Sequence, residues 1–150
     1  MLAKITTFFQ SLNEESSSDA KALSVEMACT VLLCEVMRAD GHLDDAEQSF
    51  LSKIISEQFS LLPNEVSELI KKAIELSEHA VDFHQFTSKI NSQYSPQEKE
   101  QIVTLLWQLA MADGEIASIE EHIIRRISDL LHLSHAQYIR AKSSVKKNEG

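Results

Sequence analysis

The stretch MRADGHLDDAE at residues 37–47 decides the fold, because MADGEIASIE at residues 111–120 repeats its central features. Each stretch comes after an apolar segment, contains Ala-Asp-Gly, and has a glutamate six residues after the glycine. The chain has only 3 glycines, of which Gly41 and Gly114 occupy this repeated position and Gly150 is the last residue. A glycine directly after a helix can adopt a positive φ and end the helix sharply. The two stretches therefore predict twin helix–turn–helix corners.

The similarity between the two halves extends beyond these corners. Shifting the second half by 73 residues brings apolar positions on both sides of the Asp-Gly pair into register. The aligned pairs are Leu32 with Leu105, Leu33 with Leu106, Leu43 with Ile116 and Ile54 with Ile127. After a gap of one residue, Phe59 and Leu61 align with Leu131 and Leu133. Duplication followed by divergence explains this repeat most simply, and it predicts two halves packed about a pseudo-twofold axis.

Composition and apolar spacing predict an all-α, single-domain helical bundle of about seven or eight helices. The 150 residues can bury one substantial core, and 3 Gly with 2 Pro leave few turn formers for a strand-rich fold. A central buried helix is expected from about residue 20 to residue 39. Pro63 should begin another helix, and Ser95-Pro-Gln-Glu98 is a strong start signal. We expect residues 1–18 to form an amphipathic segment and linker, and residues 19–148 to form the helical domain.

The net charge of -9 disfavours nucleic acid and anionic lipid as partners. The sequence contains no run of about eighteen apolar residues, so we expect no membrane-spanning helix. The first residues lack the features of a signal peptide but carry apolar side chains at helical spacing. These residues are Leu2, Ile5, Phe8, Phe9 and Leu12. The segment either docks on the domain or associates peripherally with a membrane or partner through residues 1–12. We expect a cytoplasmic location, with peripheral association at the inner membrane face as an option.

The residue types of common catalytic centres do not occur at diagnostic spacings. Cys29 and Cys34 lie five residues apart on one predicted helix, so they point in different directions and suit reduced core positions. Neither Glu-x-x-His nor His-Glu-x-x-His occurs among the 6 histidines, which disfavours carboxylate-bridged iron and zinc proteases. A hydrolase with paired carboxylates would need a cleft and an acid of raised pKa. We therefore expect a non-enzymatic protein.

The acidic residues around the twin turns are candidate metal ligands. Asp40 and Asp113 fall in the last turn of a helix, where the negative end of the helix dipole disfavours a carboxylate. Arg38, the amides of the next helix or a bound cation could compensate. Side-by-side turns would concentrate carboxylates that suit Ca²⁺ or Mg²⁺, although the spacing is not that of an EF-hand. The candidate ligands are Asp40, Asp44 and Glu47 in the first turn and Asp113, Glu115 and Glu120 in the second.

A structural interpretation of the same acids remains open beside the metal site. Asp44 with Glu47 can form a capping box for the helix after the first turn. Ser118 with Glu121 can take over after the second turn, because Ala117 is a poor cap. In this interpretation the turns are capped helix ends, and their remaining acids are solvated.

The twin segments Ala-Asp-Gly-x-[Leu/Ile]-x-x-x-Glu resemble the tellurite-resistance TerB-like family. They are also similar to the N-terminal domain of membrane-anchored DnaJ-like co-chaperones. The resemblance runs from about Ala20 to Lys142. It implies an all-helical, pseudo-symmetric bundle whose acidic face binds metal ions and acts in stress-response assemblies without catalysis. The matching residues are Asp40, Gly41 and Glu47, and Asp113, Gly114 and Glu120; His42 and Ala117 depart from the pattern.

The sequence is therefore compatible with two functions. The first is a divalent-metal-binding helical protein of the TerB-like type, in an assembly related to stress or tellurite resistance. The alternative is a protein-interaction adaptor that uses its acidic face or N-terminal helix without metal. The segment of residues 1–12 would carry the partner contact in the second case.

Overall fold

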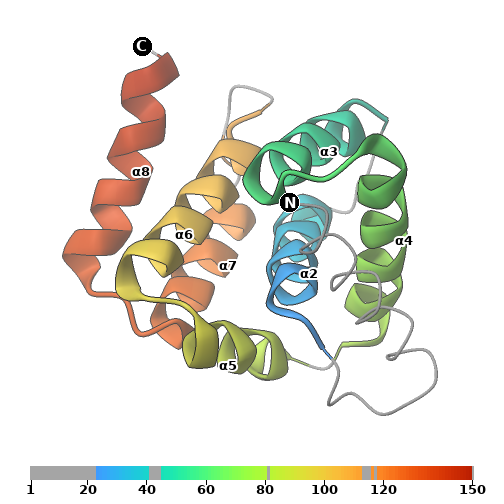
Figure 1. Cartoon of the computed structure of the whole chain (residues 1–150). Helices are drawn as coiled ribbons and strands as arrows, with labels where there is room; N and C mark the ends of the chain where they lie inside the picture. Colours follow the sequence, from blue (N-terminus) through green and yellow to red (C-terminus); the bar gives the residue numbers. More distant parts are fainter. Residues whose placement is uncertain (1–22, 41–44, 81, 113–115, 117, 150) are drawn as a thin grey trace.

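The computed structural model describes residues 23–40, 45–80, 82–112, 116 and 118–149, without the side chains of Asp40, Ala46 and residues 146–149. These residues form helices and connecting turns with no strand (Figure 1). The elements are α2 (Val25–Met37), the 3-10 helix η2 (Arg38–Asp40), α3 (Asp45–Phe59), α4 (Pro63–His79), α5 (His84–Gln93), α6 (Pro96–Ala110), α7 (Ser118–Leu130) and α8 (His135–Glu149). The predicted all-α, single-domain bundle is confirmed. The boundaries expected at residues 18 and 148 remain predictions, since residues 1–18 lie outside the described part.

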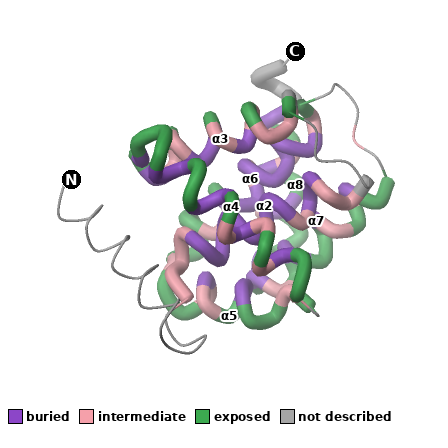
Figure 2. Tube along the Cα trace, turned by 90° about the vertical axis from the view of Figure 1, so that its right-hand side faces the viewer, coloured by how far each residue is buried: buried purple, intermediate pink, exposed green. Residues whose placement is uncertain are grey.

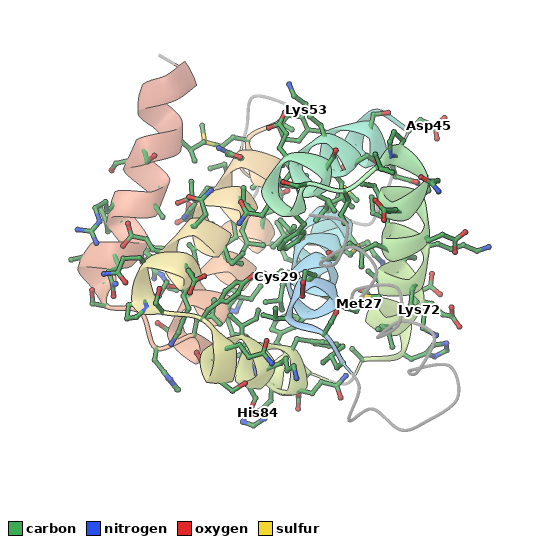
Figure 3. All side chains as sticks on the ribbon, viewed as in Figure 1. Met27, Cys29, Asp45, Lys53, Lys72 and His84 are labelled. Carbon is green, nitrogen blue, oxygen red and sulfur yellow. The ribbon has the colours of Figure 1, made fainter. Side chains whose placement is uncertain are left out.

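Helix α2 runs through the centre of the bundle. It packs against α4, α5 and α6, and Figure 2 shows it buried among the surrounding helices. Every residue from Met27 to Cys34 is buried, because this segment carries almost no side chain that needs water. In Figure 3, Met27 and Cys29 lie on α2 inside the bundle, whereas His84 lies at its outer surface. The helix is thus buried along its central part, while its two glutamates, Glu26 near the start and Glu35 near the end, are only partly buried.

The start of α2 differs from the sequence prediction. We expected the helix to begin near residue 20, but Leu23 is not helical and Ser24 has the extended backbone of an N-cap. The hydroxyl of Ser24 accepts a hydrogen bond from the amide of Met27 at 3.1 Å. This side chain satisfies an amide that the first turn leaves without a helical partner. At the other end α2 stops at Met37, and η2 continues the chain as a tighter turn to Asp40.

The predicted starts of two other helices are confirmed. Pro63 is the first residue of α4. At α6 the amide of Ser95 donates to Oε1 of Glu98 at 2.9 Å, and the amide of Glu98 donates to the Ser95 hydroxyl at 3.2 Å. This reciprocal pair is the capping box expected from the local sequence.

A second reciprocal capping box starts α8 and was not predicted. The amide of Ser134 donates to Oε1 of Gln137 at 2.9 Å, and the amide of Gln137 donates to the Ser134 hydroxyl at 3.1 Å. The Ser-x-x-Gln spacing in the sequence was a sufficient signal for it.

The two halves of the bundle pack in the same pattern. Helix α2 packs on α4 as α6 packs on α8, and α2 contacts α7 as α6 contacts α3. An equivalent backbone hydrogen bond also occurs at the α3–α4 corner and at the α7–α8 corner. The amide of Leu61 donates to the carbonyl of Ser56, and the amide of Leu133 donates to that of Ser128, each at 3.2 Å. These features agree with the sequence repeat, while a duplication in the history of the chain remains a prediction.

Candidate functional site

The candidate metal ligands are only partly within the described structure. Asp44, Asp113 and Glu115 lie outside the described residues, and of Asp40 only the backbone, at the end of η2, is described. Glu47 lies in the first turn of α3, and Glu120 in the first turn of α7. The expected cluster of six carboxylates therefore remains a prediction.

Glu47 and Glu120 occupy equivalent positions after the two turns. Glu120 is only 8% exposed, and Glu47 is partly buried. The positive end of each helix dipole favours a carboxylate in the first helical turn. Burial of a charged group costs free energy unless an opposite charge or hydrogen bonds compensate for it. The low exposure of Glu120 thus shows that its carboxylate is held within the protein and is not simply a solvated surface acid.

The segment that enters the first turn packs against the helix that leaves the second turn. Residues of η2 contact residues of α7, and α2 contacts α7 as well. Figure 1 shows α7 behind α6, with α2 beside them. The described parts of the two corners are therefore joined through η2 and α7.

Arg38 was one of the groups expected to compensate the charge of Asp40. Its Nη1 atom donates a hydrogen bond to the hydroxyl of Ser77 at 2.7 Å. The Ser77 hydroxyl in turn donates to Oε1 of Glu35. Ser77 is buried at 4% exposure, so this chain of hydrogen bonds connects the end of α2 to the end of α4 inside the protein. Sequence reasoning missed Glu35 and Ser77, because no local pattern relates residues about forty positions apart.

No group of three or more His, Cys, Asp or Glu side chains that could hold a metal ion occurs in the part of the chain that the structure describes. Since this part includes neither Gly41 nor Gly114, the finding does not test the twin turns.

The two cysteines are buried and free. Burial raises the pKa of the Cys34 thiol to about 12, and it raises the pKa of Cys29 further. The nearby carboxylates of Glu26 and Glu35 add to these shifts. Both thiols are therefore protonated at neutral pH and lack the thiolate form that nucleophilic chemistry requires. Their expected place in the core is confirmed.

Aromatic and basic side chains meet where α6, α7 and α8 join. The rings of Trp107 and Tyr138 have centroids 5.5 Å apart. The Lys142 ammonium lies 5.1 Å from the centroid of Trp107, and the Arg125 guanidinium lies 5.5 Å from that of Tyr138. Lys142 also pairs with Glu121 at 3.3 Å. Because cations favour the faces of aromatic rings, these contacts fasten α8 to α6 on one side and to α7 on the other.

None of the helices in the described ranges combines the length and the apolar character that crossing a membrane requires. The family model described as "Tellurite resistance protein TerB" matches residues 26–143, which include both Asp-Gly turns. No curated protein and no solved structure matches the chain significantly. The family match covers well over half of the sequence and agrees with the helical, internally similar bundle. The chain belongs to the family of the tellurite resistance protein TerB.

Proposed function

We propose that the chain is a non-enzymatic protein that binds a divalent cation, Ca²⁺ or Mg²⁺, at its twin Asp-Gly turns. Family membership supports this proposal, because the matched region spans both turns and connects the chain to proteins of tellurite resistance. All-oxygen ligand sets of carboxylates suit these hard cations. The ligands would come from Asp40, Asp44 and Glu47 in one turn and from Asp113, Glu115 and Glu120 in the other.

The contact between η2 and α7 is the observation that carries the proposal. It joins the segment that ends at Asp40 to the helix whose first turn contains the buried Glu120. Carboxylates gathered around such a contact repel one another in a chain of net charge -9, and a divalent cation relieves this repulsion. The ion would then stabilise the fold by binding the native state only.

The melting temperature with and without the ion tests the proposal. Calcium or magnesium at about one hundred times its Kd should raise the melting temperature by about 5–10 °C. The double variant Asp40→Asn with Asp113→Asn should lose this rise. The matched control is Glu78→Gln with Asp129→Asn, which neutralises two exposed acids outside the turns and should keep the rise.

Titration calorimetry and the melting temperature can each contradict the proposal. If neither Ca²⁺ nor Mg²⁺ produces binding heat or a change in melting temperature, the chain is not a receptor for these ions. If the Asp40→Asn, Asp113→Asn variant retains the full rise, the ion binds elsewhere and the assignment to the turns is wrong.

We further propose that the bound form acts with other proteins in resistance to tellurite or a related stress. The partner would recognise the acidic surface of the chain. The adaptor alternative differs in needing no ion, so capture of a partner that is unchanged in EDTA would favour it.

A further inference from the structure

A cavity of about 310 Å³ lies between the ends of α2 and α4, the start of α5 and the side of α7. Its described lining residues are Glu35, Ala80, Asp82, Phe83 and Arg126. None of these five belongs to the twin Asp-Gly turns. The volume falls at the lower end of the range of about 300–1,000 Å³ found for small-molecule sites. The cavity therefore suits a ligand about the size of one amino acid.

Three charged side chains from separate elements line this cavity. Glu35 comes from α2, Asp82 from the connection before α5, and Arg126 from α7. The Arg126 side chain makes no hydrogen bond or ion pair with the described residues, although two carboxylates line the same cavity. The positive and negative groups are thus separated by the cavity and can each meet a group of opposite charge on a ligand.

The two carboxylates are held in place by the protein. Oε1 of Glu35 accepts from the buried hydroxyl of Ser77, which itself accepts from Arg38 at 2.7 Å. Oδ1 of Asp82 accepts from the amide of His84 at 2.9 Å, at the start of α5. Because these bonds fix each side chain before a ligand arrives, less conformational entropy is lost on binding.

The other two described lining residues are apolar. Ala80 and the partly buried Phe83 lie next to the charged groups along the α4–α5 connection. An aliphatic chain between two charged ends could cover these side chains and gain from their removal from water.

We propose that this cavity binds a free basic α-amino acid, lysine or arginine. Its two cationic groups match the carboxylates of Glu35 and Asp82, and its carboxylate matches the guanidinium of Arg126. Its methylene chain covers Phe83 and Ala80. A simple anion would meet two carboxylates of like charge, and a simple diamine would leave Arg126 without a partner.

Isothermal titration of the full chain with L-lysine and L-arginine in EDTA tests this assignment. Both should give saturable binding of one molecule per chain. The variants Glu35→Gln, Asp82→Asn and Arg126→Gln should each weaken binding about tenfold or more, because each removes one charge-assisted contact. Gln and Asn retain an oxygen that can accept from Ser77 and from the His84 amide, so the local structure should persist. Glu78→Gln, an exposed neutralisation on α4 outside the described lining, is the matched control and should bind as the parent does.

Three related probes separate the contributions of the ligand groups. L-norleucine lacks the side-chain cation, 1,5-diaminopentane lacks the carboxylate, and Nα-acetyl-L-lysine lacks the α-ammonium. Each should bind about tenfold more weakly than L-lysine or worse. No saturable heat from L-lysine or L-arginine up to about 10 mM would overturn the proposal. Binding of diaminopentane as tight as that of L-lysine would overturn the role of Arg126. Binding of the acetylated probe as tight as that of L-lysine would show that a free α-ammonium is not required, and the ligand would then be a lysine within a peptide and not the free amino acid. The titration contains no divalent ion, so its result is independent of the proposed metal site.

Discussion

Ser60 and His132 both have left-handed backbone conformations, with φ of 55° and 63°, and they lie 72 residues apart at equivalent corners of the two halves. Ser60 directly follows α3, and His132 follows the last turn of α7. Neither residue is glycine, although the left-handed region costs other residues about 1–2 kcal/mol. The two halves therefore reverse the chain with the same unfavourable backbone geometry, and the corner hydrogen bonds at Leu61 and Leu133 accompany it.

Replacing either of these residues with glycine should stabilise the protein. Ser60→Gly or His132→Gly removes the strain of the Cβ atom but adds freedom to the unfolded chain, which leaves a net gain of about 0.5–1 kcal/mol. Urea denaturation measures the change in free energy of unfolding. Ser60→Val is the contrasting variant and should destabilise, since a β-branched residue tolerates positive φ poorly. Equal stability of the glycine and valine variants would contradict the strain assigned to this corner.

The Ser77 hydroxyl should contribute measurably to stability. Ser77→Ala leaves Arg38 and Glu35 without their shared hydrogen-bond partner, so the free energy of unfolding should fall by about 1–3 kcal/mol. Ser52→Ala is the matched control, because its hydroxyl bonds only to the Gln48 carbonyl of its own helix, and it should cost less than about 0.5 kcal/mol. The comparison again uses urea denaturation. Equal losses in the two variants would show that the α2–α4 connection adds nothing.

The native protein should resist thiol reagents. Cys29 and Cys34 are fully buried, and burial keeps the pKa of Cys34 at about 12, so both remain protonated at pH 8. Labelling by a disulfide reagent should be slowed about a thousandfold or more relative to the chain in urea, since it requires opening of the core. In urea both of the 2 cysteines should react. Rapid reaction of the folded chain would contradict the closed environment of α2.

The ion pair between Glu100 and Arg140 should contribute stability that depends on pH. Two guanidinium nitrogens of Arg140 donate to the two Glu100 oxygens at 2.8 and 2.6 Å, and these hydrogen bonds lower the pKa of Glu100 below its ordinary value of 4.5. A carboxyl group whose pKa is lower in the folded state than in the unfolded state contributes its full stabilisation of the fold at pH values above its unfolded pKa. This contribution is lost as the pH falls through the folded value.

Arg140→Gln should therefore lower the melting temperature at pH 7, and the difference from the parent should disappear in acid below the folded pKa of Glu100. Carboxyl NMR should show the Glu100 pKa moving up towards 4.5 in the variant. Lys71→Gln, an exposed change on α4, is a suitable control. An unchanged Glu100 titration in Arg140→Gln would exclude Arg140 as the cause of the shift.

Local sequence signals located several helix boundaries because they act within one turn. Ser95, Pro96 and Glu98 supply the cap, the first residue and the returning carboxylate of α6, so neighbouring residues suffice to place its start. The start of α2 was placed too early, because the preceding segment holds several residues that can cap a helix. The correct one, Ser24, is selected only when the buried length of α2 is known.

The polar contacts between helices could not be read from the sequence. The hydrogen bonds among Arg38, Ser77 and Glu35 depend on how α2 and α4 cross, and residue spacing contains no such information. The cavity that includes Glu35 and Arg126 likewise requires α2 and α7 to be neighbours. By contrast, the repeated Asp-Gly pairs were visible at once, since a repeat is a property of the sequence itself. Their carboxylates remain the predicted part of the candidate site.

The environment of Trp107 makes its fluorescence an intrinsic probe of how the helices pack. This residue is the one tryptophan of the sequence, it is fully buried, and the Lys142 ammonium lies over its ring. Helix α6, which carries Trp107, ends at Ala110, three residues before Asp113. A movement that separates α8 from α6 would take the cation off the indole and change its emission. Fluorescence can thus follow how events at the second turn spread into the bundle without any added label.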